Sequence, residues 1–362
     1  MDIIITQKST HGNSRVRFVE KIDNIFRIKI NKYENVAILT DNNLYKHYKK
    51  YIKTKDALLI KVKPGELSKS LKSKNYIENL LFKNGFNRNS LFITFGGGVI
   101  GDLGGYVAST FMRGIDLIHV PTSLVAMVDS SIGGKTGIDN KFGKNLIGTF
   151  YNPKEIIVNK KFLETLPKKE IRQGLAEIIK YGIIEDKSLF SILENKELDF
   201  TKNTNALQNK IIKKCIDIKI RVVEEDFREN NKRMILNFGH TVGHAIERYY
   251  EYKKSHGDCI GVGMLIESKI ASMVGVLAEK DYLRIKNILK RFNLLTLELK
   301  SNSIKKLINN MKLDKKNKSN KITFVLPEKI GKIKRWPNLY STQIAEKVIA
   351  EAIRSALNEV KN

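Results

Sequence analysis

The chain has little cysteine and no long hydrophobic run, and each shortage limits what it can be. Its 362 residues include only two cysteines, Cys215 and Cys259, which make no disulfide framework and are typical of the reducing cytoplasm. No uninterrupted apolar stretch approaches the roughly 20 residues that a membrane-spanning helix needs. The first residues lack the basic segment of a signal peptide and are typical of a first strand. We therefore expect a cytoplasmic protein with no membrane partner.

Acidic residues are also few relative to basic ones. The chain has 38 aspartates and glutamates and 65 lysines and arginines, which gives a net charge of +27. Such an excess can indicate nucleic acid or an anionic surface. The lysines are, however, spread through every segment together with asparagine and isoleucine, as an AT-rich genome would dictate, and aromatic residues do not interleave with them. We therefore expect no nucleic-acid partner, with at most some steering of an acidic substrate that salt would weaken.

The first part of the chain alternates short apolar runs with helical patterns, which is typical of a parallel sheet. Strands are predicted at 35–40, 57–62, 91–95 and 116–120, and a helix at 70–83 that ends at an Asn-Gly cap signal. We therefore expect an α/β domain with a Rossmann-like parallel sheet over residues 1–158.

Beyond about residue 160 the pattern changes to amphipathic helices. Apolar residues recur at helical spacing in 171–183, 205–225, 240–250, 261–276 and 342–357. About two domains are expected for this length. We therefore predict a mainly α-helical domain over residues 159–362, with the active site in the cleft between the two domains.

A glycine-rich turn follows the predicted strand 91–95. Gly96-Gly97-Gly98-Val99-Ile100-Gly101-Asp102 satisfies the Gly-x-Gly-x-x-Gly pattern between a strand and a helix. Its glycines let a pyrophosphate approach the backbone, and the helix N-terminus favours negative charge. We predict a dinucleotide site here, although such turns also serve packing. Asp41, at the end of an earlier strand, can hold a ribose hydroxyl or be an ordinary surface turn residue.

A second glycine-rich turn imitates a Walker A loop through Gly134-Lys135-Thr136. The motif requires a glycine five positions before Gly134, where this chain has Asp129, so the sequence excludes a P-loop. A lysine in such a turn can still bind a phosphate or carboxylate, or the turn can be purely structural.

Histidine is scarce, and its distribution is the most informative feature of the chain. Three of the six histidines, His240, His244 and His256, lie close together, and the first two are one helical turn apart. Imidazole is the commonest protein ligand of metals. Upstream, Glu177 and Lys180 share a helix face, either in a site or as an exposed ion pair. Spacing alone favours His240 and His244 as joint metal ligands, with a carboxylate nearby.

The combination of features predicts a class of chemistry. Arg233 and Asn237 lead into the histidine segment and place a cation and an amide near the predicted metal. A dinucleotide, a divalent metal and fixed cations suit the oxidation of a hydroxyl group on an anionic substrate. The residues alone therefore predict a metal-assisted, NAD-dependent reaction on a phosphorylated acid.

In order and spacing, five motifs between about residues 35 and 335 resemble the 3-dehydroquinate synthase family. They are Gly96–Asp102, Asp129–Lys135, Gly143-Lys144-Asn145, Leu175–Gly182 and Asn237–His244. The resemblance implies the shikimate-pathway conversion of 3-deoxy-D-arabino-heptulosonate 7-phosphate, a sugar-phosphate acid, to 3-dehydroquinate and phosphate. It also implies NAD, a zinc or cobalt ion, and a course of transient oxidation, phosphate elimination, re-reduction and intramolecular aldol cyclisation.

The resemblance also implies roles for individual residues, and it changes the expected metal ligands to Glu177, His240 and His256. His244 is then turned toward the substrate, and Arg113 reaches the phosphate from a neighbouring subunit, which implies a homodimer. The other implied catalytic or substrate-binding residues are Asp129, Lys135, Lys144, Asn145, Lys180, Lys219, Arg233, Asn237, Lys315 and Lys316. The implied NAD-binding residues are Asp41, Glu66, Lys69, Gly97, Gly98, Val99, Asp102, Thr122, Ser123, Lys135 and Lys144.

Two places depart from the family pattern. Phe227 and Asn231 stand where the family usually has an acidic residue and a glycine. Asparagine tolerates a left-handed backbone, so we expect this turn to survive. After Lys315-Lys316 the expected glycine is replaced by Ser319-Asn320, which leaves open which lysine binds the substrate.

The alternatives are a sister cyclase acting on sedoheptulose 7-phosphate or glucose 6-phosphate, and a metal-dependent polyol dehydrogenase of related fold. The substrates of the sister cyclases lack the carboxylate that Lys219 and Arg233 are expected to hold, which argues against them. A dehydrogenase would release NADH.

Overall fold

The chain forms two compact units in a computed structural model that describes residues 4–8, 12–22, 32–52, 57–201, 206–299, 301–313 and 321–361. Unit 1 comprises Met1–Ile171 and Phe200–Glu224, and unit 2 comprises Arg172–Asp199 and Glu225–Asn362. The boundary expected after residue 158 stays a prediction about domains. In the structure, the segment Phe200–Glu224 groups with unit 1.

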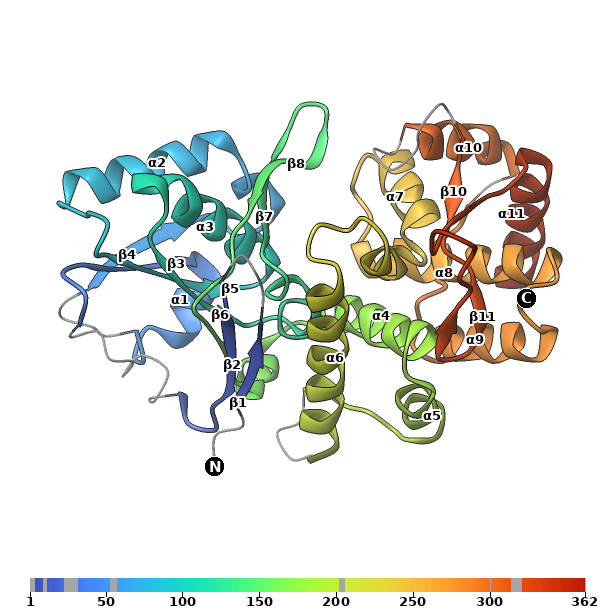
Figure 1. The fold of residues 1–362 in the computed structure, drawn as a ribbon, viewed down its shortest axis with the longest axis horizontal. Coiled ribbons are helices and arrows are strands. Elements are labelled where there is room, and N and C mark those ends of the chain that lie inside the picture. The colour runs from blue at the N-terminus through green and yellow to red at the C-terminus, as the bar shows by residue number, and fades with distance from the viewer. Residues whose placement is uncertain are drawn as a thin grey trace. The chain divides into compact units, whose positions relative to one another are not determined.

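Unit 1 contains a seven-stranded sheet in the order β1-β2-β9-β6-β5-β3-β4 (Figure 1). All neighbours are parallel except β1 and β2. This arrangement confirms the Rossmann-like parallel sheet. The strands are β1 (Ile4–Gln7), β2 (Ser14–Phe18), β3 (Val36–Asp41), β4 (Ala57–Val62), β5 (Leu91–Gly96), β6 (Asp116–Pro121) and β9 (Glu155–Val158).

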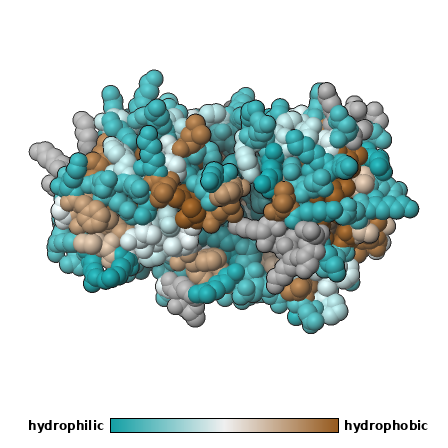
Figure 2. Space-filling view, turned by 90° about the horizontal axis from the view of Figure 1, so that it is seen from above, coloured by the Kyte–Doolittle hydropathy of each residue, from teal (hydrophilic) through white to brown (hydrophobic). Residues whose placement is uncertain are grey.

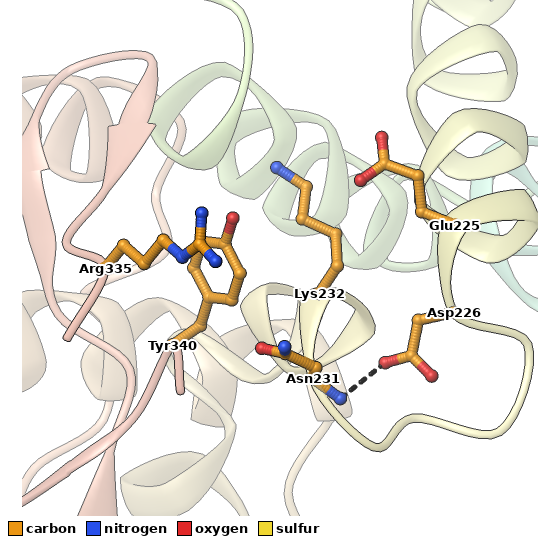
Figure 3. A pocket seen from close by; sticks show the side chains of 6 residues that line it. All are labelled: Glu225, Asp226, Asn231, Lys232, Arg335 and Tyr340. Atoms are coloured by element: carbon orange, nitrogen blue, oxygen red, sulfur yellow. Dashed lines mark hydrogen bonds between the residues drawn. The ribbon is translucent and has the colours of Figure 1, made fainter. Parts of the chain in front are cut away.

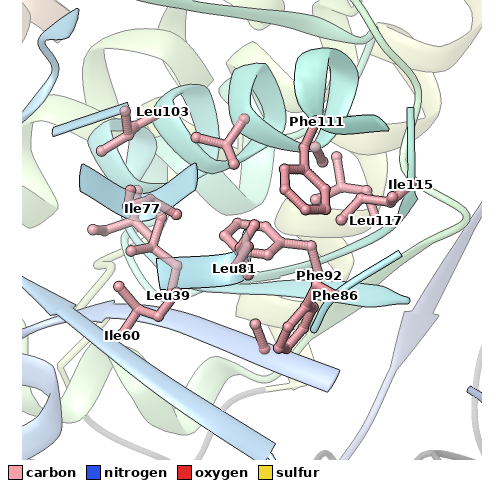
Figure 4. Packing of buried hydrophobic residues seen from close by; sticks show 14 of the residues in the cluster. Leu39, Ile60, Ile77, Leu81, Phe86, Phe92, Leu103, Phe111, Ile115 and Leu117 are labelled. Atoms are coloured by element: carbon pink, nitrogen blue, oxygen red, sulfur yellow. The ribbon is translucent and has the colours of Figure 1, made fainter. Parts of the chain in front are cut away.

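Helices cover both faces of this sheet, with α1 on one face and α2 and α3 on the other (Figure 1). The helices are α1 (Asn42–Tyr48), α2 (Leu71–Lys83) and α3 (Gly98–Thr110). Leu81 of α2 and Leu103 of α3 are fully buried with Phe92 of β5 and Leu39 of β3 (Figure 4). A strand covered on both faces needs a continuous apolar run rather than an alternating one, which is why β3 and β5 were recognisable in the sequence.

The strand order reverses direction between β3 and β5, because β4 lies outside β3 while β6 and β9 lie on the other side of β5. At such a switch point the loops after neighbouring strands run to opposite faces and leave a crevice beyond their carboxyl ends. Asp41 ends β3 and Gly96 ends β5. The topology therefore brings the two predicted dinucleotide-binding segments together at the carboxyl ends of β3 and β5.

Unit 1 also contains a β-hairpin that the sequence analysis did not predict. Helix α6 (Ala206–Glu225) belongs to unit 1 as well, up to residue 224. The hairpin joins β7 (Lys135–Asn140) to β8 (Gly143–Phe150) and packs on α3. Phe142 at its tip is 70% exposed.

Figure 2 shows hydrophobic side chains only in small patches between hydrophilic ones on the face in view.

Unit 2 is mainly helical, as predicted. Its helices are α4 (Lys168–Ile184) from Arg172 onward, α5 (Lys187–Asn195), α7 (His240–Tyr249), α8 (His256–Met273), α9 (Glu279–Arg291), α10 (Ile304–Lys312) and α11 (Glu346–Lys361). Two small sheets join β10 (Thr323–Phe324) to β13 (Thr342–Gln343) and β11 (Pro327–Lys329) to β12 (Lys332–Ile333).

Helices α7 and α8 approach each other closely because glycines line their contact. A Cβ atom on Gly263 of α8 would lie 2.0 Å from the Gly239 carbonyl oxygen, and one on Gly243 of α7 would lie 3.2 Å from the Ile260 Cα. Gly239 itself has a left-handed backbone, with φ of 80°. Larger residues at these positions would force the two helices apart, so the contact depends on the absence of side chains.

Candidate active site

Three side chains of unit 2 converge on one point. Glu177 comes from α4, while His240 and His256 are the first residues of α7 and α8. The Glu177 Oε1 atom lies 3.6 Å from His240 Nε2 and 3.3 Å from His256 Nε2. Donor atoms about 2.0–2.2 Å from one tetrahedral zinc ion are about 3.3–3.6 Å from one another. The geometry therefore fits a single divalent metal ion.

Each of the two histidines is oriented by its other ring nitrogen. His240 Nδ1 lies 3.1 Å from the Phe238 carbonyl oxygen, and His256 Nδ1 lies 3.2 Å from Glu247 Oε1. A carbonyl or carboxylate oxygen only accepts, so Nδ1 carries the proton and Nε2 faces Glu177. Both rings are thereby turned for metal binding.

Glu177 is 1% exposed and pairs with Lys180 one turn further along α4. Burial opposes ionisation of this carboxyl, but the charge of Lys180 and the hydrogen bond from His256 outweigh it and hold the pKa of Glu177 far below its ordinary value. Lys180 is itself 2% exposed. The Glu177–Lys180 pair is therefore a buried element of the cluster and not an exposed surface ion pair.

The environment of His256 is strongly negative. Desolvation disfavours the charged imidazolium, but hydrogen bonds to Glu177 and Glu247 outweigh it and raise the pKa of His256 to about 10. Two carboxylates around one imidazole favour a positive charge at this point, which a proton or a metal ion can supply.

His244 lies beside the cluster but outside its donor group. Among the described residues, the ligand atoms that lie within 4.8 Å of one another belong to Glu177, His240 and His256. The ring centroid of His244 is 5.3 Å from that of His240 and 6.5 Å from that of His256. The three side chains brought together are those that the resemblance implied, whereas helical spacing alone had favoured His240 with His244.

Arg233 and Asn237 lie in the short 3₁₀ segment Lys232–Asn237 that precedes α7. Arg233 is 1% exposed, and its Nη1 donates to the Phe227 carbonyl oxygen at 2.5 Å. The Asn237 amide donates to Glu229 Oε1 at 2.6 Å. A buried guanidinium so close to the histidine segment suits a substrate carboxylate.

The turn before this segment differs from the expectation. Asn231 has φ of −151° and is not left-handed, while Glu229 has φ of 62°. Asp226 holds the turn instead, because its carboxylate accepts from the backbone amides of Asn231 at 2.7 Å and Arg233 at 3.1 Å. The turn therefore survives through a side-chain acceptor and not through the backbone tolerance of asparagine.

Unit 2 also has a pocket of about 330 Å³ that holds none of the predicted site residues (Figure 3). Its cations are already engaged, since Lys232 lies 3.2 Å from Glu185 and Arg335 packs over the Tyr340 ring. We therefore place the candidate site at the histidine cluster. The pocket is lined by Glu225, Asp226, Asn231, Lys232, Arg335 and Tyr340.

In unit 1 the glycine-rich turn opens α3 as predicted. Gly97 is the N-cap of α3 and offers no side-chain hydrogen bond, so the first amides of the helix lack a side-chain cap. A Cβ atom on Gly97 would meet Ser123 Oγ at 3.3 Å, and one on Gly98 would meet Ser130 Oγ at the same distance. An anion at this helix end would meet backbone donors and two hydroxyl groups.

A buried ion pair lies at the same helix end. Lys69 is 4% exposed, and its Nζ lies 2.5 Å from Asp102 Oδ2 and 3.9 Å from Glu66 Oε1. Burial alone would lower the pKa of Lys69, but the charges of Asp102 and Glu66 outweigh it and raise that pKa. These three residues of the implied NAD set are thus brought together, although Asp102 is distant in the sequence from Glu66 and Lys69.

The remaining residues of the implied NAD set lie near strand ends. Asp41 caps α1, and its Oδ1 accepts from the amides of Asn43 at 2.8 Å and Leu44 at 3.0 Å. The Thr122 amide donates to the Gly96 carbonyl at 3.0 Å, which ties the ends of β6 and β5 together. Val99 follows Gly98 in the first turn of α3, and Ser123 follows Thr122.

Two more predicted residues meet in unit 1. Asp129 lies in a π-helical turn, Ala126–Ser130, and its Oδ1 lies 2.6 Å from Lys219 Nζ of α6. π-turns are rare and are often found at functional sites. Because the chain between these residues is long, sequence spacing gave no sign of the pair.

The second glycine-rich turn leads into strand β7 and not into a helix, which agrees with the exclusion of a P-loop. Lys135 is the first residue of β7, and Lys144 and Asn145 are the second and third residues of β8. Arg113 is exposed and has φ of 67°. Lys315 and Lys316 lie outside the described residues.

One functional candidate was missed in the sequence. Glu247 closes the histidine motif, seven positions after His240, and its 5% exposure marks it as a buried acid. The only sequence signal was an acidic residue on the apolar side of an amphipathic helix.

The chain shares its fold with solved synthases. The chain has a TM-score of 0.87 and 24% identity with 2-deoxy-scyllo-inosose synthase complexed with carbaglucose-6-phosphate, NAD+ and Co2+, over 98% of this chain and 99% of that one. It has a TM-score of 0.85 and 19% identity with 2-epi-5-epi-valiolone synthase from Streptomyces hygroscopicus subsp. jinggangensis 5008, solved with NAD+ and Zn2+, over 97% and 98% of the two chains.

The sequence then shows the particular family. The family described as 3-dehydroquinate synthase N-terminal matches residues 59–173, and the one described as 3-dehydroquinate synthase C-terminal matches residues 174–317. The 3-dehydroquinate synthase of Clostridium beijerinckii is 44% identical over 84% of this chain and 88% of its own length. The chain belongs to the 3-dehydroquinate synthase family, and the function predicted from its motifs is confirmed. In the described part of the chain, no helix has the length and apolarity to cross a membrane.

Proposed function

We propose that this chain converts 3-deoxy-D-arabino-heptulosonate 7-phosphate to 3-dehydroquinate and phosphate with NAD and one divalent metal ion, zinc or cobalt. The observation that carries this proposal is the convergence of Glu177, His240 and His256 within 4.8 Å, in a chain of the 3-dehydroquinate synthase family. The solved synthases of the same fold contain NAD+ with Co2+ or Zn2+.

The donor set supports the metal part of the proposal. One carboxylate and two imidazoles leave coordination positions open for substrate, as in catalytic zinc sites. When bound there, the ion supplies Lewis acidity that polarises a substrate hydroxyl group. Lys180 holds the Glu177 carboxylate in place from within the protein. His244, beside the ligands, is positioned to contact substrate and not metal.

Unit 1 supplies the proposed NAD site. Gly97, Gly98 and Val99 present the start of α3 to the pyrophosphate, and the buried Lys69–Asp102 pair fixes the same helix end. Because α1 and α3 start at neighbouring strands β3 and β5, Asp41 is suited to the ribose next to that pyrophosphate. The full proposed set is Asp41, Glu66, Lys69, Gly97, Gly98, Val99, Asp102, Thr122, Ser123, Lys135 and Lys144.

The substrate is proposed to be held by charge and by hydrogen bonds. Lys219 and Arg233 are 7% and 1% exposed, and buried cations of this kind suit a carboxylate better than a neutral ring. This supports the acid substrate over the carboxylate-free substrates of sister cyclases. Further proposed contacts are Asp129, Lys135, Lys144, Asn145, Lys180, Asn237, His244, Lys315 and Lys316.

We also propose a homodimer in which Arg113 of one subunit reaches the phosphate bound by the other. Met112 and Arg113 both have left-handed backbones, with φ of 51° and 67°, which is uncommon for residues other than glycine. Such strain at an exposed arginine suits a functional constraint. The two buried cysteines form no disulfide, which is consistent with the proposed cytoplasmic location.

Phosphate release from 3-deoxy-D-arabino-heptulosonate 7-phosphate, measured with NAD and zinc or cobalt while NADH absorbance is followed, tests the proposal. We expect phosphate without accumulated NADH, and loss of the reaction with a chelator. Accumulating NADH would identify a polyol dehydrogenase. Phosphate from glucose 6-phosphate or sedoheptulose 7-phosphate alone would identify a sister cyclase.

A further inference from the structure

Helices α7 and α8 each begin with one of the proposed metal ligands, and a carboxylate of the opposite helix holds each beginning. Glu247 of α7 accepts from His256 Nδ1 at 3.2 Å. Glu267 of α8 accepts from the backbone amides of Gly239 at 2.8 Å and Val242 at 3.1 Å, around the start of α7. The two helices therefore brace each other at the ends that carry His256 and His240.

Both carboxylates are buried, since Glu247 is 5% exposed and Glu267 is fully buried. A buried carboxylate is costly unless hydrogen bonds satisfy it. Glu267 is explained by helix capping, because Gly239 lacks a side chain and the amides of α7 need an acceptor. Glu247 instead accepts from the imidazole of a proposed metal ligand, His256.

The two histidines also differ in the acceptor that faces Nδ1. The Nδ1 atom of His240 faces a neutral backbone carbonyl, whereas the Nδ1 atom of His256 faces the carboxylate of Glu247. A carboxylate behind an imidazole fixes its tautomer and ring orientation and strengthens the other nitrogen as a ligand. The carbonyl behind His240 can orient that ring but adds no charge.

We propose that Glu247 is a positioning residue that holds His256 and strengthens its bond to the metal ion. This inference rests on the proposed function, because it requires a metal ion at Glu177, His240 and His256. Glu247 itself does not belong to the donor group. Its contribution therefore passes through His256.

The test uses the full chain, freed of metal with a chelator, and measures Zn2+ affinity by competition with a chromophoric chelator. Glu247→Gln keeps the shape and an accepting oxygen but removes the charge, and we expect roughly 10–100-fold weaker Zn2+ binding. The visible absorption of the Co2+-loaded chain should also change, because it reports the ligand field. Unchanged Zn2+ affinity and an unchanged Co2+ spectrum would overturn the proposal.

The matched control is Glu251→Gln, which removes the same charge just after the end of α7. Glu251 is exposed and pairs with Lys253 at the surface, so its replacement should leave Zn2+ affinity unchanged. An equal loss in both variants would show a long-range charge effect and overturn the positioning role.

Two further variants keep the test decisive. Glu267→Gln should lower the thermal stability and leave the Co2+ spectrum closer to that of the unaltered chain; identical spectral changes in the two variants would reduce Glu247 to a packing role. If Glu247→Gln does not fold, Glu247→Asp retains the charge and should bind Zn2+ with intermediate affinity. No Zn2+ binding by the unaltered chain would overturn the proposed function together with this inference.

Discussion

His119 of unit 1 and His256 of unit 2 differ in what surrounds their rings. His119 of β6 is 5% exposed, and its Nδ1 lies 2.6 Å from the Thr94 hydroxyl. Burial lowers the pKa of His119 to about 4, whereas the carboxylates around His256 raise the pKa of that ring to about 10 despite desolvation. One ring is a neutral part of a sheet core, and the other lies where the chain concentrates negative charge for a cation.

The same contrast extends to the two sites. In unit 1 the proposed NAD site relies on the backbone, with glycines, a helix N-terminus and a reversal of strand order. In unit 2 the proposed metal site relies on side chains from three helices. The first kind of site can be recognised as a sequence motif, and the second depends on how helices pack.

The largest effect on the contrast between the two sites is expected when a proposed metal ligand of unit 2 is removed. His256→Ala should lower turnover roughly 1000-fold or more, because several kcal/mol of transition-state stabilisation are lost with the ion. NAD affinity should remain, since unit 1 is unchanged. Turnover and bound metal, by elemental analysis, check this. Glu177→Gln should behave alike, and full activity of either variant without metal would contradict the ligand assignment.

The glycine contact between α7 and α8 allows a second test. Gly263→Ala places a Cβ 2.0 Å from the Gly239 carbonyl oxygen, and the overpacking should cost about 3 kcal/mol of unfolding free energy. Denaturant unfolding checks this, and Zn2+ affinity should fall in parallel. The control is Gly101→Ala in unit 1, where a Cβ meets no atom within 4 Å and stability should hold or rise.

The third test concerns the proposed contact of Lys219 with the substrate carboxylate. Lys219→Ala removes a buried ammonium and leaves Asp129 without that partner, so we expect KM for the substrate to rise roughly 10–100-fold. NAD affinity should change little. Steady-state kinetics and NAD titration separate the two effects. A substrate affinity equal to that of the unaltered chain would remove Lys219 from the carboxylate site.

The smallest expected effect concerns His119. Its folded pKa of about 4 lies below the ordinary value of 6.5, so the unfolded chain binds the proton more strongly between these values. The stability that neutral His119 provides is therefore present above pH 6.5 and is lost as the pH falls toward 4. About 2 kcal/mol should be lost between pH 7.5 and pH 5.

Urea unfolding of the chain and of His119→Asn, at both pH values, measures this loss. The variant should show a smaller drop in stability on acidification, whatever its stability at pH 7.5. Equal drops in both proteins would mean that His119 does not titrate as its burial implies.

Much of unit 1 could be predicted because its elements are local in the sequence. The predicted strand 57–62 coincides with β4, and the predicted helix 70–83 differs from α2 by one residue. The hairpin β7–β8 was missed because the turn at Gly133-Gly134 that leads into β7 imitates a phosphate loop, and because β8 shows no apolar alternation.

The sequence by itself determined the residue types and their family: a glycine turn, a histidine motif and enough matching positions to imply the reaction. It could not determine from spacing which side chains share a metal ion, because His240 and His244 are one turn apart on the same helix. The family resemblance implied His256, but only the tertiary structure brings its ring to Glu177, at the start of α8. The physical reason is that ligand atoms must meet within a few ångströms, and that distance is set by the glycine-lined contact of α7 with α8 and by the buried carboxylates that hold their ends.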